Sequence, residues 1–534
     1  MTVADTIVLA RRIHTLDPDL PTATALAITD GRIAAVGSPS ELKPFSGPGT
    51  TVLDYGDATI VPGLNDSHTH VVFGLDLARG LQLTDLGPLD EVQRIIGDAA
   101  AAAEPGEWVI GWGLDPNLFT SIGFSGRLFD DATGPVPMFL RMRDGHSAIV
   151  NSAALAASGI TGPVDFPDES MIDVDDDGTP TGYLVEFSAM DLATKALPQE
   201  GFDVRAERLG ELLNGMAAVG VTSTHVMDYA EGSGELAAHL EARGELPLRL
   251  RFSPMVHAGA SLHELEKAAA LQGTGGRRWR VEGVKFFIDG TIDNGSAWLE
   301  QPDAYGENHE SVWTDPEDFQ KALRFFVERG IPTATHAIGD QGVRYVLDAL
   351  EAAGYSRGFA AHRIEHIETI PDDLVARFAE LGVAASMQPV HGTHHTRADR
   401  TDNWSVRLGG ERAARGWRCR DLREAGVTVA LGSDWPITPY DPRAMMADSI
   451  LRRPVERPDV EPVQPEQALT AMMALEGYTS HAAAAAGLTA ETGTISVGKL
   501  ADLTVFEQDP LLVTPEELAR TSVVATFVSG LPTR

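Results

Sequence analysis

Apolar, strand-like runs recur along the middle of the chain, and helix-like sequence separates each run from the next. Strand–helix alternation is typical of a parallel sheet. Eight such units predict an α/β protein with a (β/α)8 TIM barrel over residues 59–486. The eight runs are TIVPGLNDSHTH (59–70), GVTSTHVMD (220–228), LPLRLRFSPM (246–255), VEGVKFFIDG (281–290), GIPTATHAIGD (330–340), HRIEHIETI (362–370), GVAASMQPV (382–390) and GVTVALGSDWP (426–436).

The two ends of the chain have a different pattern, with short strands separated by turns. Residues 5–55 contain several strand-like segments, and the Asp-Gly pair within TDGRIAAVG (29–37) predicts a hairpin. The C-terminal segments GTISVGKLADLTVFEQDP and SVVATFVSGLPTR are strand-like again. We therefore expect residues 1–58 and 487–534 to pair into one small β-sandwich domain.

One connection is much longer than the others, because about 150 residues separate the first predicted barrel strand from the second. This segment includes the strand-like PVPMFLRMRDGH (135–146) and an acidic stretch rich in Gly and Pro at 161–182. We expect an insertion over about residues 77–205. An insertion at this point lies on the catalytic face of a barrel, where it can act as a lid.

The overall composition narrows the range of partners. The chain has 534 residues, with 42 basic against 77 acidic side chains and a net charge of −35. That excess disfavours nucleic acid and anionic membrane surfaces as partners.

The single cysteine, Cys419, excludes an internal disulfide and a cysteine-based zinc site. No secretory signal and no membrane-length apolar run are visible, so a cytoplasmic location is the default expectation.

Residues able to bind a metal ion stand at the C-terminal ends of the predicted barrel strands. Side chains alternate along a strand, so His68 and His70 project together, and neutral imidazole is a good ligand for zinc and similar ions. His336, His366 and Asp434 end three later strands, where a barrel would make them converge. Taken singly, each could be a solvated or hydrogen-bonded residue at the barrel mouth. Together they favour a metal site.

Lys285, in VEGVKFFIDG, is the only lysine in one of the apolar strands. A buried ammonium group is costly unless it is paired or neutralised. Reaction with carbon dioxide would turn the amine into a carboxylate that can bridge two cations. An ion pair with Asp289 or Glu282 is the alternative, and the residues alone leave both open.

The order His-x-His, Lys, His, His, Asp on predicted strands one, four, five, six and eight resembles the amidohydrolase superfamily. Within it, RMRDGHSAIVNSAAL, GVKFFIDGTIDNG, THAIGD and GSDWP closely resemble the YtcJ-like branch, which includes N-substituted formamide deformylases. The segments ITDGRIAAVG, TIVPGLNDSHTH and GKLADLTVFEQDP match the small β-domain of that superfamily and its junctions. The resemblance covers nearly the whole chain.

The resemblance implies a site for one or two zinc ions, with other divalent metals as alternatives. His68 and His70 would bind the more buried ion, and His336 and His366 the second. Lys285, carboxylated by carbon dioxide, would bridge the two ions.

The resemblance also implies that Asp434 ligates the first ion and serves as general base, so Asp434 and Lys285 are the predicted catalytic residues. A bound metal lowers the pKa of water from 15.7 to about 7, which supplies hydroxide at neutral pH. Asp434 would then pass the proton to the leaving nitrogen. Asp66 is expected to fix an imidazole or a turn rather than to bind metal.

Further residues are candidates for substrate contact, each with a structural alternative. The insertion motif RMRDGH could instead be a salt-bridged lid strand, and Glu186 could cap a helix. HGTHHT (391–396) is more simply a solvated loop, and Trp435 and Trp298 could be core residues. His225 is expected to be a hydrogen-bonding residue of the barrel mouth. The predicted substrate contacts are Arg141, Asp144, His146, Glu186, Asp289, His391 and Trp435.

Taken together, the sequence predicts a metal-dependent amidohydrolase that cleaves a C–N bond, an amide or an N-acyl group of a small molecule. Ester or lactone hydrolysis, deamination and decarboxylation at the same site are alternatives, as is a barrel that binds metal and ligand without turnover. H-E-x-x-H, Walker A and C-x-x-C motifs are absent from the sequence. The sequence leaves the oligomeric state open, with a homodimer as the commonest case.

Overall fold

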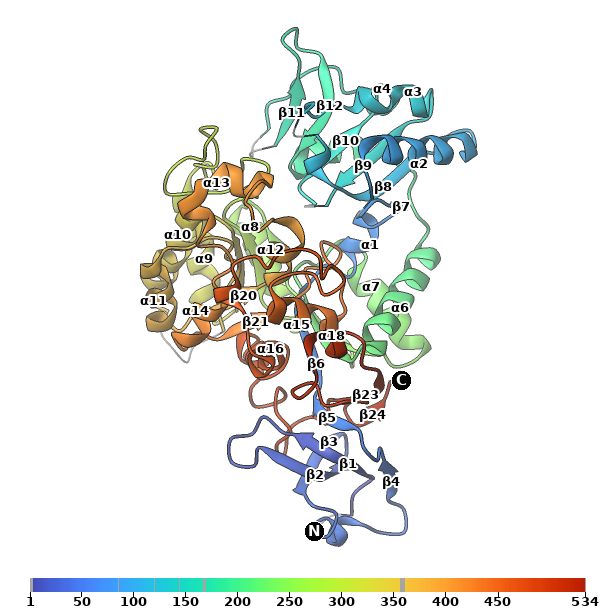
Figure 1. The fold of residues 1–534 in the computed structure, drawn as a ribbon, viewed down its shortest axis with the longest axis vertical. Helices are drawn as coiled ribbons and strands as arrows, with labels where there is room; N and C mark the ends of the chain where they lie inside the picture. The colour runs from blue at the N-terminus through green and yellow to red at the C-terminus, as the bar shows by residue number, and fades with distance from the viewer. Residues whose placement is uncertain are drawn as a thin grey trace.

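The computed structural model describes residues 3–84, 86–119, 121–143, 145–166, 170–355 and 361–533. Figure 1 shows three parts stacked along the long axis. A β-domain carries the N-terminus at the bottom, an α/β body occupies the middle, and a smaller α/β part stands at the top. The α/β class predicted from the sequence is confirmed.

The bottom part is a sheet that both ends of the chain build together. Its strands follow the order β24-β23-β22-β5-β1-β2-β3, and β4 pairs with β1. The antiparallel pairing of β22 with β5, from Leu503 opposite Pro62 to Phe506 opposite Thr59, joins the two ends. The strands are β1 (Thr6–His14), β2 (Thr22–Thr29), β3 (Arg32–Gly37), β4 (Thr51–Asp54), β5 (Thr59–Pro62), β22 (Leu503–Phe506), β23 (Val523–Val528) and β24 (Leu531–Pro532).

The body contains two parallel sheets, in the orders β16-β14-β13-β6 and β15-β17-β18-β19-β20-β21. A parallel bridge between Thr69 and Trp435 joins them on one side, and β14 runs through Ser253 and Pro254 into β15 on the other. The strands are β6 (Leu64–Thr69), β13 (Val221–Val226), β14 (Arg249–Phe252), β15 (Met255–Val256), β16 (Trp279–Val281), β17 (Val284–Phe287), β18 (Thr333–Ala337), β19 (Arg363–His366), β20 (Ala384–Met387) and β21 (Val429–Leu431).

Helices follow these parallel strands and cover them. The bounds are α6 (Phe202–Ala218), α7 (Ser233–Arg243), α8 (Leu262–Ala270), α9 (Pro316–Val327), α10 (Asp340–Ala352), α11 (Asp372–Leu381), α12 (Pro389–His395), α13 (Asn403–Ala413), α14 (Cys419–Glu424), α15 (Pro442–Leu451), α16 (Ala471–Gly477), α17 (Ser480–Ala485) and α18 (Pro515–Leu518).

Helix α9 illustrates why these segments are helical and how they pack. The Asp315 side chain accepts a hydrogen bond from the Glu317 amide, and Pro316 occupies the first turn, where a missing N–H costs nothing. Phe319, Leu323 and Phe326 recur at helical spacing and are fully buried. The rings of Phe319 and Phe326 contact Phe286 of β17 edge-on, at 5.4 and 5.8 Å between centroids. The apolar stripe therefore fixes the helix on the sheet.

The top part inserts between β6 and β13. Its sheet has the order β11-β12-β10-β9-β8-β7, and RMRDGH begins in β9. Its elements are α1 (Phe73–Leu77), β7 (Leu81–Gln82), α2 (Leu89–Ala102), β8 (Val109–Leu114), α3 (Asp130–Thr133), β9 (Met138–Met142), β10 (Ser147–Val150), α4 (Ser152–Ser158), β11 (Met171–Val174), β12 (Pro180–Val185) and α5 (Phe187–Thr194).

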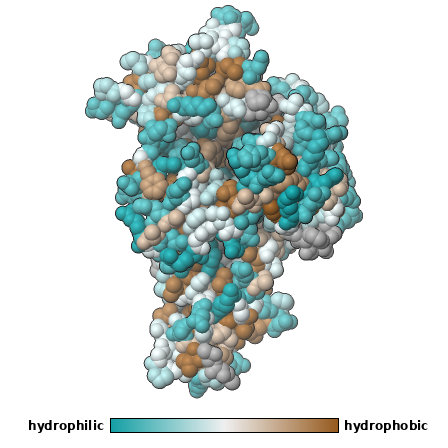
Figure 2. All heavy atoms as spheres, turned by 180° about the vertical axis from the view of Figure 1, so that it is seen from behind, coloured by the Kyte–Doolittle hydropathy of each residue, from teal (hydrophilic) through white to brown (hydrophobic). Residues whose placement is uncertain are grey.

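Figure 2 shows mainly hydrophilic side chains, with small apolar groups scattered between them. Among the described residues, no helix combines the length and apolar character needed to cross a lipid bilayer.

Candidate metal centre

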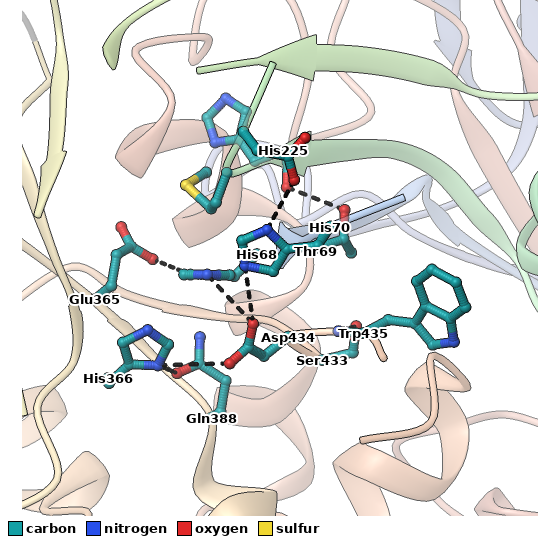
Figure 3. A network of polar contacts seen from close by, with 12 residues as sticks. His68, Thr69, His70, His225, Glu365, His366, Gln388, Ser433, Asp434 and Trp435 are labelled. Carbon is teal, nitrogen blue, oxygen red and sulfur yellow. Dashed lines mark hydrogen bonds and ion pairs between the residues drawn. The ribbon is translucent and has the colours of Figure 1, made fainter. Parts of the chain in front are cut away.

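The ends of β6 and β21 bring two imidazoles and a carboxylate together (Figure 3). His68 is fully buried and His70 is 8% exposed. Asp434 Oδ1 lies 3.4 Å from Nε2 of His68 and 3.4 Å from Nε2 of His70. Ligand atoms around a tetrahedral zinc with bonds of 2.0–2.1 Å are about 3.3 Å apart. The two contacts with Asp434 therefore have the spacing of a metal site.

A carboxylate holds each of these imidazoles from behind. Nδ1–H of His68 donates to Glu365 Oε2 at 2.6 Å, and Nδ1–H of His70 donates to Asp228 Oδ2 at 2.8 Å. Both bonds direct the Nε2 atoms toward Asp434. Within the described part of the chain, the buried Nε2 of His68 has no hydrogen-bond partner. This orphaned atom and the choice of tautomer fit a divalent cation.

Glu365 is itself held in a buried polar chain. Nε of Arg363 donates to Glu365 Oε1 at 2.6 Å, and Nη1 of Arg363 lies 2.8 Å from Nδ1 of His225. His225 accepts from Nε of Arg251 on its other side, at 2.9 Å. His225 is thus a buried hydrogen-bonding residue, as expected, but it contacts arginines and does not line the cavity over the ligands. The chain fixes the carboxylate that orients His68.

The backbone near the strand ends departs from the strand pattern. His366 has φ 73° and Asp434 has φ 56°, in the left-handed region that few residues other than glycine adopt. Asp66 Oδ1 accepts from the amides of His68 and Ser433, at 3.2 and 3.0 Å. Asp66 therefore ties β6 to the segment after β21. That is the turn-fixing role expected for it.

A second group of possible ligands lies on the other side of Asp434. Asp434 Oδ2 is 3.9 Å from Nδ1 of His366 and 3.8 Å from Nε2 of His391. His336 lies beside this group, with its ring centroid 4.5 Å from that of His366. Nε2 of His336 is 3.1 Å from the carbonyl oxygen of Gly290. The structure thus brings His336 and His366 together and adds His391.

Lys285 is fully buried in β17. No hydrogen-bond partner of its Nζ occurs among the described residues, and the atom lies 4.9 Å from the centroid of the Phe287 ring. Burial lowers the pKa of Lys285 to about 8. Neither Asp289 nor Glu282 forms an ion pair with it in the described residues, because Asp289 binds backbone amides and Glu282 pairs with Arg251.

Burial and neighbouring charges set the protonation of the first three ligands. Burial opposes a charge on His70, but its contacts with Asp228 and Asp434 raise its pKa to about 9. Burial and the nearby Lys285 hold the pKa of His68 well below its usual value. Burial would raise the pKa of Asp434, but attraction to His68 and the contact with His70 outweigh it and hold that pKa well below its usual range. Asp434 is therefore a carboxylate.

Two adjoining cavities open over these side chains. The smaller, of about 90 Å³, is lined by the ligands and by apolar residues such as Trp404 and Trp417. The larger, of about 490 Å³, lies beside it. Both are lined by Phe73, His146, Phe187, Met255 and Phe287, so the insertion contributes part of the wall.

Of the predicted substrate contacts, His146 lines both cavities. Its Nδ1–H donates to Glu186 Oε2 at 2.8 Å, and Glu186 Oε1 accepts from Ser296 at 2.8 Å. Glu186 lines the larger cavity. HGTHHT does not form the solvated loop considered for it, because it belongs to α12, and His391 is only 6% exposed.

Three other predicted substrate contacts are Asp289, Arg141 and Trp435. The carboxylate of Asp289 is fully buried and accepts from the amides of Ile338, Gly339 and Trp298. Arg141 is buried in β9 and donates to the carbonyl of Gly145 at 3.0 Å. In Figure 3 the indole of Trp435 is directed away from Asp434. These surroundings favour a packing role for Arg141 and Trp435, whereas Asp289 also lines the larger cavity. Asp144 lies outside the described residues.

Several side chains of the site did not stand out in the sequence. Glu365, Asp228 and Gln388 contact the imidazoles from behind, and Glu368 lines the smaller cavity. Burial and the nearby Asp293 raise the pKa of Glu368 to about 8. One of these residues could have been noticed in the sequence. Glu365 is a carboxylate within the apolar strand HRIEH, directly before His366.

The comparison with known protein families decides the assignment. The sequence profile described as "Amidohydrolase family" matches residues 51–533. The chain belongs to the amidohydrolase family. The predicted resemblance is confirmed, and so is the predicted enzyme class, a metal-dependent hydrolase acting on carbon–nitrogen bonds.

Individual relatives agree over nearly the full length. The chain is 28% identical to the putative amidohydrolase YtcJ of Bacillus subtilis, covering 97% of each chain. It is 28% identical to N-substituted formamide deformylase of Arthrobacter pascens, covering 99% of this chain and 98% of that one. The crystal structure of an uncharacterized metal-dependent hydrolase from Pyrococcus horikoshii superposes with a TM-score of 0.73 at 22% identity, covering 96% of this chain and 99% of that one. That structure supports the fold.

Proposed function

We propose that this amidohydrolase cleaves the C–N bond of an amide, an N-acyl or N-formyl amine of a small molecule, with a metal-activated water and Asp434 as general base. The observation that carries the proposal is the meeting of Asp434 with His68 and His70 at 3.4 Å, each imidazole held by a carboxylate behind it. The full-length similarity to a formamide deformylase supports the same reaction.

In the proposed mechanism, zinc bound to these residues would supply a water whose pKa is near 7. Asp434, ionised and 6% exposed, accepts the proton of the attacking water and delivers it to the nitrogen that leaves. His68 and His70 keep their Nε2 atoms directed inward because Glu365 and Asp228 hold the opposite nitrogens. Aromatic side chains such as Trp404 and Trp417 line the cavity beside them.

Lys285 is proposed to react with carbon dioxide. Its neutral amine adds to the carbon of CO₂, an N–C bond forms, and one proton is released to solvent. The product is a carbamate that removes a buried positive charge. The support for this step is the full burial of Lys285 and its Nζ, which no described residue hydrogen-bonds. A pKa near 8 leaves a useful fraction of neutral amine at pH 7–8.

The cavity walls suggest which substrates are accepted. Among the described residues that line the two cavities there is no arginine, and Lys285 is the lysine present. Carboxylates line both, with Asp434 and Asp293 in the smaller and Asp191 and Asp228 in the larger. A carboxylate or phosphate on the substrate would be repelled here. We therefore propose uncharged or basic amides as substrates, in preference to N-acyl amino acids.

The arrangement of strands supports a closed (β/α)8 barrel built from both parallel sheets, because they join at β6 with Trp435 and at β14 with β15. The proposed divisions are the β-domain at 1–58 and 487–534 and the barrel at 59–486, with the insertion at about 77–205. In this arrangement the insertion forms a wall of the substrate cavity.

The reaction is tested with zinc-loaded protein and matched substrate pairs. We expect amine release from N-formyl and N-acetyl derivatives of uncharged amines, and none from metal-stripped protein. N-acyl amino acids of similar size should show kcat/KM at least tenfold lower. Turnover of the corresponding esters with no amine release from any amide would refute the C–N assignment.

A further inference from the structure

Helix α12 starts directly after β20 and brings an additional imidazole to the metal centre. Gln388, the residue before the helix, accepts a hydrogen bond from Nδ1 of His366 at 2.9 Å. His391 lies in the first turn, 6% exposed, and its ring stacks beside that of His366 at 6.2 Å and 18°. Its buried Nε2 has no hydrogen-bond partner in the described part of the chain. A buried polar atom without a partner calls for a ligand.

The position of His391 is fixed by the packing of α12. A Cβ atom at Gly392 would lie 2.7 Å from the Trp417 ring, so this glycine allows the helix to approach that ring closely. On the opposite side Nε2 of His394 lies 2.7 Å from Asp448 Oδ2 on α15. Pro389 fixes the first turn. His391 is therefore held in place by its surroundings.

We propose that His391 is a ligand of a second divalent cation, which it binds together with His366 and Asp434. This inference rests on the proposed metal centre and adds a residue that the resemblance does not supply. The metal centre has two halves, one with His68 and His70 and one with His366 and His391. Asp434 contacts both, with Oδ1 toward the first half and Oδ2 toward the second. One carboxylate atom from Asp434 and one nitrogen from each imidazole lie within 4.8 Å of one another.

The spacing fits a cation after a small adjustment. The distance of 3.8 Å from Asp434 Oδ2 to Nε2 of His391 exceeds the roughly 3.3 Å of a tetrahedral zinc site by about half an ångström. Small side-chain rotations close such a gap. The hydrogen bond from His366 Nδ1 to Gln388 leaves Nε2 of His366 unprotonated and able to bind.

His336, which the resemblance assigns to the second ion, keeps Nδ1 free for a cation, because the hydrogen on its Nε2 is donated to a carbonyl oxygen. Its Nε2 faces the carbonyl oxygen of Gly290, and its ring stacks on Phe287 with centroids 4.6 Å apart. Among the described residues, His336 belongs to neither group of three His, Asp or Glu side chains with ligand atoms within 4.8 Å. His391 is the imidazole that joins His366 and Asp434.

The test counts bound metal and does not depend on turnover. Metal-stripped full-length protein is dialysed against zinc, and bound metal is measured by elemental analysis. We expect two ions per wild-type chain and one in His391→Asn, with the second bound at least tenfold more weakly. His395→Asn is the matched control, because His395 shares α12 and the same cavity but lies outside the three-residue group. It should retain two ions.

A second variant separates ligation from folding. His391→Asp supplies a different ligand atom at the same position and should restore the second ion. Visible absorption of the cobalt-loaded proteins should change with His391→Asn and not with His395→Asn. Two ions in His391→Asn at wild-type affinity, or a single ion in the wild type, would overturn the inference while leaving the proposed hydrolysis intact. A wild-type chain that binds no metal would refute both proposals.

Discussion

The two halves of the metal centre differ in what holds their imidazoles. In the first half, the charged carboxylates of Glu365 and Asp228 accept from His68 and His70. In the second half the acceptors are neutral, the amide oxygen of Gln388 for His366 and the carbonyl of Gly290 for His336. A carboxylate makes the imidazole a stronger ligand and fixes it more firmly. The first half should therefore bind its cation tightly and the second more weakly.

Asp434 is the residue that both halves share, so its replacement has the largest expected effect. Asp434→Asn preserves the shape but removes the base and one negative charge. We expect kcat to fall by about a thousandfold, within the usual range for a general base. Steady-state kinetics on a cleaved amide measures this. Asp441→Asn, at the start of α15, is the control and should leave kcat unchanged. A wild-type kcat in Asp434→Asn would remove Asp434 from the mechanism.

Changing one supporting side chain in each half of the metal centre tests how much that support contributes to zinc affinity. Glu365→Gln removes the charged acceptor behind His68, and we expect zinc affinity of the first site to fall by about 10–100-fold. Gln388→Leu removes the neutral acceptor behind His366 and should weaken the second site less than tenfold. Zinc titration calorimetry on metal-stripped protein gives both constants. Equal losses in the two variants would show that carboxylate support does not distinguish the halves.

The two halves should also respond differently to pH. His70, with a pKa of about 9 in the metal-free protein, must lose a proton when a cation binds. Affinity at the first site should therefore rise about tenfold per pH unit from pH 7 to 9 and level off above. Burial lowers the pKa of both His366 and His391, so these rings are neutral at pH 7 and the second site should vary little. Zinc titrations at pH 7, 8 and 9 measure how the affinity of each site changes with pH.

The first half could be predicted from the sequence because it depends on strand geometry. His68 and His70 are two residues apart on a strand, and parallel strand ends converge, which brings Asp434 to them. The second half depends on details that periodicity does not report. HGTHHT is too short to be distinguished from a loop, yet Pro389 and Gly392 allow a buried helix there. That helix is what carries His391 inward.

Two further features of the site depend on the backbone. The sequence left Asp289 open as an ion-pair partner of Lys285 or as a substrate contact. In the structure three backbone amides donate to its carboxylate, and Asp289 also lines the larger cavity. Alternation along β19 would place Glu365 and His366 on opposite faces, yet both serve the site, because the backbone of His366 turns at φ 73°. Backbone acceptors and isolated left-handed residues leave little trace in a hydrophobic pattern.

The most direct test of the metal centre is a reconstitution titration. Protein stripped by a chelator is given zinc in steps, while amine release and bound zinc are measured on the same samples. We expect no activity without metal and recovery that follows zinc bound at the His68, His70 and Asp434 site. Undiminished amine release from fully stripped protein would contradict the account.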